Sequence, residues 1–174
     1  MRMRNTARKV TLSAVLAALS LVFLYLAGFA PTGKVGLVAA AGLFPAAAVI
    51  SFGFSAGVLS YLGTGILSLI LLPDKGMALL YILFFGLYPM LKGKIEQFRR
   101  LPVELGIKFL VCNLILTVML LFFGTVFFRA VPLGQYSRLV LYLICNVAFF
   151  AYDYGFSKVI GFYIQRVDRV VRKG

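Results

Sequence analysis

Three polar side chains, Asn113, Asn146 and Asp153, interrupt long apolar runs and are the residues best placed to do chemistry. A carboxylate within a membrane costs about 2.5–3.5 kcal/mol on insertion scales, so Asp153 should have a partner. Asn113 follows Lys108 by five residues, and Asp153 precedes Lys158 by five. If both lysines mark one interface, the spacing predicts an interhelical polar pair, Asn113–Asp153. A substrate contact or a proton-linked carboxylate is the alternative.

A second polar group is expected nearer to the opposite membrane face. Asn146 lies eight residues after Arg138, and Tyr142, four residues before Asn146, shares its helix face. Tyr81 and Lys34 are expected at a similar level. Tyrosine and asparagine offer the ring surface and hydrogen bonds that a small-ligand site uses, so these five residues predict a pocket open to the outside. An interfacial tyrosine belt, with Asn146 joining helices, is the alternative that the sequence leaves open.

The residue types that support catalysis are missing from the sequence. The chain has no histidine, and its only cysteines, Cys112 and Cys145, lie within apolar runs typical of reduced, buried packing residues. It also has no Walker-type phosphate loop and no paired carboxylates in one segment. The sequence therefore predicts no enzyme, no metal site and no cofactor. Uphill transport would need energy from a partner or an ion gradient.

The composition places the chain in a membrane. Of its 174 residues, 62% are hydrophobic and 13% charged, with a mean hydropathy of +1.00. A soluble domain carries about 25% charged residues, so lipid must cover much of this surface. The net charge of +13 comes from short basic clusters between apolar runs, a pattern that excludes a nucleic-acid-binding face. We predict a single integral membrane domain over residues 1–174.

The apolar runs predict an all-α, polytopic bundle of about six transmembrane helices. A hydrocarbon core of about 30 Å needs about 20 helical residues, and continuously apolar runs exclude the alternating strands of a barrel. Gly53 is expected to allow a tight turn between the second and third helices, because one helix over both would be too long for a bilayer. The expected helices are Val10–Ala30, Val35–Phe52, Phe54–Leu72, Met77–Leu91, Leu105–Phe128 and one from Leu139 into the basic tail.

The distribution of cations predicts that both termini are cytoplasmic. With the N-terminus inside, 14 of the lysines and arginines lie on the inner side and 4 on the outer side, a strong positive-inside pattern. The expected location is therefore the cell membrane, as a multi-pass protein. The four outer cations are Lys34, Lys75, Arg129 and Arg138, and the inner ones are Arg2, Arg4, Arg8, Lys9, Lys92, Lys94, Arg99, Arg100, Lys108, Lys158, Arg166, Arg169, Arg172 and Lys173.

Small residues recur at helical spacing in two of these segments. They let helix backbones approach closely, which is how membrane helices associate. In the third segment, internal packing is the expected role of Ala56, Ser60, Thr64 and Ser68. In the first segment, Ala14 and Ala18 could pack internally or against a partner protein.

The chain resembles the substrate-binding S-components of energy-coupling-factor (ECF) transporters. The similarity rests on six short helices behind a basic start, on Thr11–Ser20 with the Ala-x-x-x-Ala element of Ala14 and Ala18, and on the stretch from Leu43 to Leu69. The resemblance extends over residues 8–91 in sequence. Over the remaining residues it is confined to the arrangement of helices. The resemblance implies a subunit that binds a vitamin-like micronutrient and docks, through Ala14 and Ala18, on a transmembrane coupling protein driven by two cytoplasmic ATPases.

A different class of protein remains open. A small cell-envelope scaffold without transport activity would need no outer pocket and would use the basic segment from Lys92 to Arg100 as a docking site. The substrate and the oligomeric state do not follow from the sequence.

Overall fold

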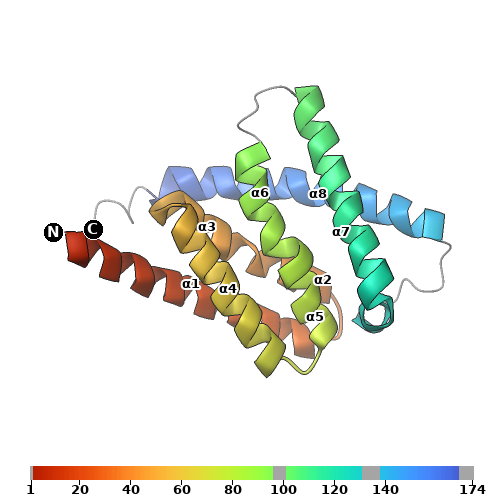
Figure 1. Cartoon of the computed structure of the whole chain (residues 1–174), viewed down its shortest axis with the longest axis horizontal. Helices are drawn as coiled ribbons and strands as arrows, with labels where there is room; N and C mark the ends of the chain where they lie inside the picture. The colour runs from red at the N-terminus through yellow and green to blue at the C-terminus, as the bar shows by residue number, and fades with distance from the viewer. Residues whose placement is uncertain (1, 96–100, 131–137, 169–174) are drawn as a thin grey trace.

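The fold is all-helical over residues 2–95, 101–130 and 138–168, which the computed structural model describes (Figure 1). Six stretches of these residues are long and apolar enough to cross a membrane, which confirms the predicted polytopic helical class. The elements in chain order are α1 (Arg2–Phe29), α2 (Lys34–Ala41), α3 (Leu43–Phe52), α4 (Phe54–Leu71), α5 (Lys75–Leu80), the π-helical turn η1 (Tyr81–Phe85), α6 (Leu87–Ile95), α7 (Leu101–Ala130), α8 (Arg138–Tyr163) and a second π-helical turn, η3 (Ile164–Asp168).

The second predicted span is broken at Gly42 into α2 and α3. Pro45 has no N–H to donate to the carbonyl of Ala41 one turn earlier. That carbonyl instead accepts a hydrogen bond from Ser20 Oγ of α1 at 2.8 Å. Gly42 lies so close to the carbonyl oxygen of Phe85 that a Cβ atom on it would be 2.1 Å away. The break is therefore stabilised by two neighbouring helices.

The fourth span is also irregular, because a π-helical turn separates α5 from α6. Gly86 N–H donates to the carbonyl of Tyr81 at 2.7 Å, one residue further back than in an α-helix. Tyr61 of α4 donates its hydroxyl to the carbonyl of Ile82 inside this turn at 2.8 Å. Pro89 follows in α6 and cannot donate to a carbonyl of the turn. These features fix where the side chains of η1 point.

The turn between α3 and α4 is as tight as predicted. Gly53 has φ = +93°, a backbone conformation that glycine adopts without steric cost. Four residues later, a Cβ atom on Gly57 would lie 2.1 Å from a methyl carbon of Val49. Glycine at both positions allows α3 and α4 to pack closely as antiparallel neighbours.

The helices α1 and α4 pack through small side chains. Thr64 of α4 donates its hydroxyl to the carbonyl of Ala17 in α1 at 3.2 Å. The small residues of α4 that recur at a spacing of four are all buried, which confirms their predicted role in internal packing: Ala56, Ser60, Thr64 and Ser68. On α1 the inward-facing residues are Ser13, Ala17, Ser20, Leu24 and Ala27.

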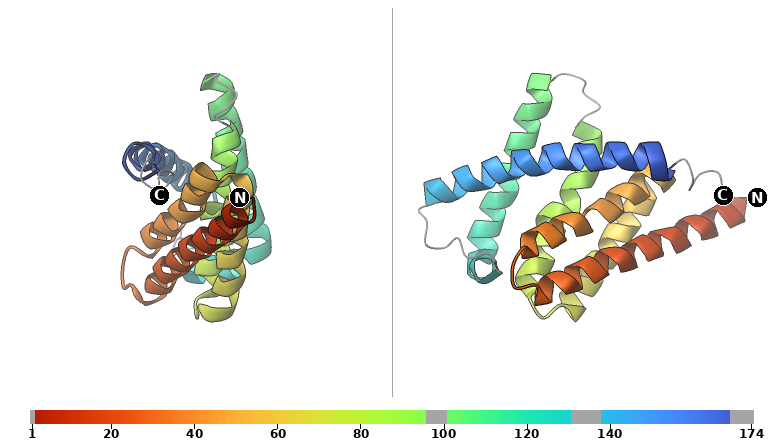
Figure 2. Two further views of the ribbon diagram at one scale, coloured as in Figure 1. Left: turned by 90° about the vertical axis from the view of Figure 1, so that its left-hand side faces the viewer. Right: turned by 180° about the vertical axis from the view of Figure 1, so that it is seen from behind.

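The last two helices are arranged differently. Figures 1 and 2 show α8 running across α7, and α8 also contacts α3. Large apolar side chains cover the outside of this part, including Leu121 at 72% exposed and Leu139 at 76%. An exterior of this kind is suited to lipid, which solvates apolar side chains without cost.

Candidate functional site

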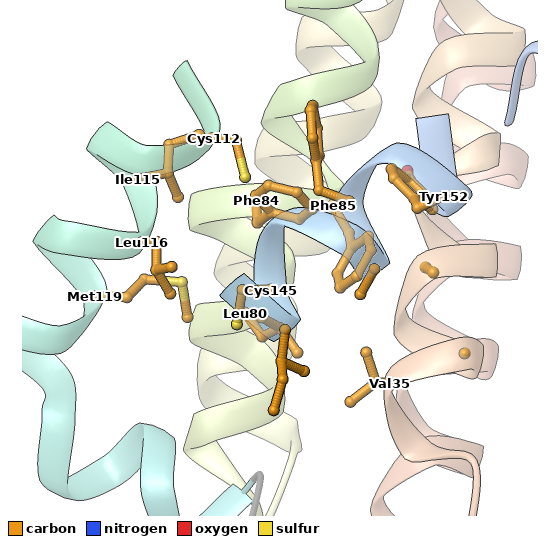
Figure 3. Close-up of a pocket in the computed structure, with 15 residues that line it drawn as sticks. Val35, Leu80, Phe84, Phe85, Cys112, Ile115, Leu116, Met119, Cys145 and Tyr152 are labelled. Atoms are coloured by element: carbon orange, nitrogen blue, oxygen red, sulfur yellow. The ribbon is translucent and has the colours of Figure 1, made fainter. Parts of the chain in front are cut away.

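A cavity of about 340 Å³ lies between α2, the α5–η1 segment, α7 and α8 (Figure 3). This volume lies at the small end of ligand pockets, which span about 300–1,000 Å³. Its lining side chains are almost entirely apolar or aromatic: Val35, Gly36, Ala39, Leu80, Phe84, Phe85, Cys112, Ile115, Leu116, Met119, Ile144, Cys145, Ala148, Phe149 and Tyr152.

Aromatic rings form one wall of the cavity. Phe84 and Phe85, both in η1, are perpendicular to each other with ring centroids 4.9 Å apart. Phe85 is also perpendicular to Tyr152 of α8 at 5.0 Å, and Phe84 meets Phe149 edge to face at 5.9 Å. Consecutive residues of a regular α-helix point about 100° apart. In η1, both phenylalanines reach the same cavity.

The mouth of the cavity lies between α2 and α8. Val35 and Ile144 line the cavity and are 39% and 37% exposed. Gly36 and Ala148, also lining residues, are exposed as well. A small molecule could therefore enter past these four residues without unfolding a helix.

Few polar atoms face this cavity. The hydroxyl of Tyr152 is buried and has no hydrogen-bond partner among the described residues. Cys112 and Cys145 add two free thiols, one from each of α7 and α8. Rings, methyl groups and a hydroxyl could bind and orient a ligand, and the described lining residues supply no acid–base pair.

A buried charged network lies beside the cavity. Asp153 of α8 forms ion pairs with Lys92 of α6 and with Lys108 of α7, the latter at 3.0 Å. Lys108 also pairs with Glu104 at 2.6 Å. Both lysine side chains are only 4% exposed. The network joins α6, α7 and α8, and its described members are two lysines and two carboxylates.

Tyr88 links the charged network to the aromatic wall. Its hydroxyl donates to Asp153 Oδ1 at 2.5 Å. Its ring stacks on Phe84, with centroids 5.8 Å apart and planes 7° apart. A displacement of Phe84 by a ligand would therefore act directly on a side chain that holds Asp153.

A second cavity, of about 300 Å³, lies between α3, α6 and α8. Lys92 lines it, together with small residues such as Gly93, Ser157 and Gly161. The ammonium group of Lys92 is engaged by Asp153, so this second cavity borders the charged network.

The predicted outer pocket does not assemble from the residues proposed for it. Tyr81 is fully buried in the core, where its hydroxyl oxygen lies 3.4 Å from Ser20 Oγ. Lys34 is the first residue of α2 and does not line the larger cavity. Arg138 begins α8, but its side chain lies outside the described residues.

The other two predicted pocket residues connect helices. Tyr142 shares a hydrogen bond with Thr117 of α7 at 2.7 Å. The side-chain amides of Asn146 and Asn113 exchange two hydrogen bonds, each 3.0 Å long. Both residues hold α8 against α7, as in the interpretation of Asn146 as a residue that joins helices.

The predicted Asn113–Asp153 pair is wrong. Asn113 pairs with Asn146, and Asp153 pairs with the two lysines. The prediction assumed that Lys108 marks the membrane interface. Lys108 is instead buried opposite Asp153, so Asn113 faces a residue seven positions earlier in α8, roughly 10 Å away along the helix.

Ala14 and Ala18 both lie on the exposed face of α1. The neighbouring face, with Ser13 and Ala17, is the one that packs inside the protein. Internal packing therefore does not account for the Ala-x-x-x-Ala element, and its predicted role in docking remains a prediction.

Sequence reasoning missed the residues that line the cavity, although it came close in position. Val35, Leu80 and Cys145 line the cavity, and each is the immediate neighbour of a predicted residue, namely Lys34, Tyr81 and Asn146. A shift of one residue turns a helical side chain by about 100°. The predicted polar residues lie on a different face of each helix from the lining residues, because the lining is apolar.

No protein-family model, curated protein or solved structure matches this chain. The class follows from the fold: a polytopic helical protein whose described residues include six stretches long and apolar enough to cross a membrane, with a small apolar cavity among them. The resemblance to ECF S-components stays a prediction.

Proposed function

We propose that this chain is the substrate-binding transmembrane subunit of an uptake system for a vitamin-like or other small micronutrient. It would act in a bacterial cytoplasmic membrane, without enzymatic activity of its own. The observation that carries the proposal is the cavity of about 340 Å³, which combines an aromatic wall with an exposed mouth between α2 and α8. A scaffold protein needs no such cavity.

The energy for uptake would come from a partner. The proposed partners are a transmembrane coupling protein and two cytoplasmic ATPases. The exposed strip of Ala14 and Ala18 supports this proposal, because small side chains permit close approach of a second helix and none of the helices that the structure describes covers them. The strip and the cavity lie on different helices, so docking and ligand binding can be tested separately.

The test replaces Ala14 or Ala18 with tryptophan and uses Val15→Trp as the matched control. Val15 is 50% exposed and lies beside Ala14 on the same helix. Ala14→Trp and Ala18→Trp should abolish uptake and pull-down of the ATPases while ligand binding survives. Val15→Trp should leave all three intact. Uptake lost with docking and binding both intact would contradict the assignment of the strip, and an absence of any ligand would favour the scaffold.

The proposal includes the predicted orientation, with both termini in the cytoplasm. Lys92 and Lys108 are buried in the charged network, so they no longer count as loop cations, but the inner side keeps its excess. In a cysteine-free background, Thr32→Cys should react with an impermeant thiol reagent on whole cells, whereas Gln97→Cys should not. The reverse pattern would overturn the topology.

A further inference from the structure

We infer that the ligand of the larger cavity is a neutral, ring-bearing small molecule whose one polar group hydrogen-bonds to the hydroxyl of Tyr152. This inference rests on the proposed function, namely that the cavity holds the substrate, and it names the chemical class of that substrate. It excludes amino acids, phosphorylated compounds and carboxylate-bearing molecules that would bury their charge there.

The neutrality follows from the lining. Within the part of the chain that the structure describes, no lining residue is charged, and none carries a side-chain amide. The nearest charged side chain in sequence, Asp153, already accepts from Lys92, Lys108 and Tyr88. A charged ligand group would therefore lose its hydration without gaining a counter-ion, which strongly disfavours its burial.

The ring follows from the geometry of the aromatic wall. Phe84 and Phe85 are perpendicular, and Phe85 and Tyr152 are perpendicular, at centroid distances of 4.9 and 5.0 Å. Aromatic rings prefer edge-to-face or offset contacts, so perpendicular rings offer a further ring both a face and an edge. A volume of about 340 Å³ is large enough for a mono- or bicyclic ring system.

The polar contact follows from the unpartnered hydroxyl. Tyr152 lines the cavity, and within the described part of the chain nothing hydrogen-bonds to its oxygen. Buried polar groups are nearly always paired in proteins, so this unpaired hydroxyl marks where a ligand group belongs. Because its oxygen is buried, the ring of Tyr152 must turn toward the cavity when the ligand binds. An acyl chain from the lipid would leave this hydroxyl unpaired, whereas a ring bearing a hydroxyl or carbonyl group would pair with it.

The chain carries its own reporter for the test. Cys145 lines the cavity beside the exposed Ile144, so a ligand in the cavity should slow its reaction with N-ethylmaleimide. The experiment uses the full chain in lipid nanodiscs with three probes: 2-naphthol, which is neutral, 2-naphthoate, which is its anionic counterpart, and 1-decanol, which mimics an acyl chain. Four proteins are compared: the wild type, Tyr152→Phe, Ala148→Trp and the control Val147→Trp.

The inference predicts that 2-naphthol protects the wild type and Val147→Trp, while 2-naphthoate and 1-decanol protect poorly. Val147 is 64% exposed and does not line the cavity, so its replacement should change nothing. Ala148→Trp fills the mouth and should abolish protection. Tyr152→Phe should weaken the binding of 2-naphthol about three- to tenfold, which corresponds to the loss of one hydrogen bond. Because Tyr152→Phe removes a single atom, it tests the inference even where Ala148→Trp does not fold.

Three results would overturn the inference. Equal protection by 2-naphthoate would contradict the inference that the ligand is neutral. If 1-decanol protects Cys145 as well as 2-naphthol does, and Tyr152→Phe has no effect, the cavity binds acyl chains rather than a ring-bearing ligand. No protection by any probe would show that the cavity takes no ligand of this class. If 2-naphthol behaves as expected but cells show neither uptake nor ATPase pull-down, the proposed function fails and the ligand class stands.

Discussion

The helices α1, α3 and α4 are held together by close backbone contacts, whereas α7 and α8 are held by side chains that reach across a gap. A Cβ atom on Gly63 of α4 would lie only 3.9 Å from that of Ala17, and Thr64 donates directly to the Ala17 carbonyl at 3.2 Å. Between α7 and α8 the contacts are side-chain bonds, such as Asn113–Asn146 at 3.0 Å. Both cavities border α8, and neither borders α1 or α4.

This difference separates a rigid part from an adjustable part. Small residues in close contact leave little room for alternative packing, so α1, α3 and α4 should move as a unit. Long side chains such as Lys92 and Lys108 can keep their bonds while a helix shifts. Ligand binding and any coupled movement are therefore expected around α8.

The largest effect is expected from removing Asp153. Asp153→Leu leaves Lys92 and Lys108 buried without this carboxylate and should lower the free energy of unfolding by about 3–5 kcal/mol. Thermal unfolding in detergent measures the loss. Asp74→Ala is the control: it removes only the N-terminal cap of α5, a bond of 3.0 Å to Gly76 N–H, and should cost about 0.5–2 kcal/mol.

The same network permits a rescue experiment. Adding Lys92→Met and Lys108→Met to Asp153→Leu should restore most of the lost stability, because apolar residues of similar volume can replace buried ion pairs. If Asp153→Leu costs no more than Asp74→Ala, the network does not hold α6, α7 and α8 together.

A smaller effect is expected at the break between α2 and α3, where Gly42 lies against η1. Gly42→Ala places a methyl group against the Phe85 carbonyl oxygen, 2.1 Å away, and should destabilise the protein by about 1–3 kcal/mol. Gly36→Ala is the matched control in the same span, because nothing lies within 4 Å of its Cβ position. Thermal unfolding of both variants compares them, and equal stability would show that the helices can separate at Gly42.

Replacing Ser20 should lower the free energy of unfolding less than replacing Gly42. Its hydroxyl donates to the Ala41 carbonyl at 2.8 Å, which Pro45 leaves without its helical donor. Ser20→Ala should therefore cost about 1 kcal/mol of unfolding free energy. Ser157→Ala should cost almost nothing, because Ser157 is exposed and bonds within its own helix. Equal losses would mean that the Ala41 carbonyl finds another donor.

The smallest effect is the coupling between helices α7 and α8. A double-mutant cycle of Asn113→Leu and Asn146→Leu should give an interaction energy of about 0.6 kcal/mol, the average for interhelical polar pairs in membranes. A parallel cycle of Asn113 with Asp153 should be additive within about 0.3–0.5 kcal/mol. Coupling between Asn113 and Asp153, with none between Asn113 and Asn146, would show that Asn113 pairs with Asp153 after all.

The helices could be predicted because the apolar runs are long and each must satisfy its backbone hydrogen bonds within lipid. The tight turn at Gly53 could be predicted from length alone. The break at Gly42 and the π-turn at Tyr81–Phe85 could not, because both depend on neighbouring helices: Ser20 and Phe85 at the first, Tyr61 at the second.

The site was harder to predict than the fold. Lys92 and Lys108 were placed in a cytoplasmic loop or at its edge, since a lysine after an apolar run normally ends in water. Their buried pairing with Asp153 requires three helices to meet, and no spacing along one segment encodes that meeting. A polar network this close to an apolar cavity becomes visible only after the helices are packed.

The most direct test of the proposed function is native mass spectrometry of the protein purified from its own membrane. The wild type and Val147→Trp should retain the mass of one bound small molecule, and Ala148→Trp, which fills the mouth of the cavity, should lose it. Fragmentation of the released molecule should show a neutral ring system. A wild-type spectrum with no bound molecule other than lipid, identical to that of Ala148→Trp, would contradict the claim that this chain is a substrate-binding subunit.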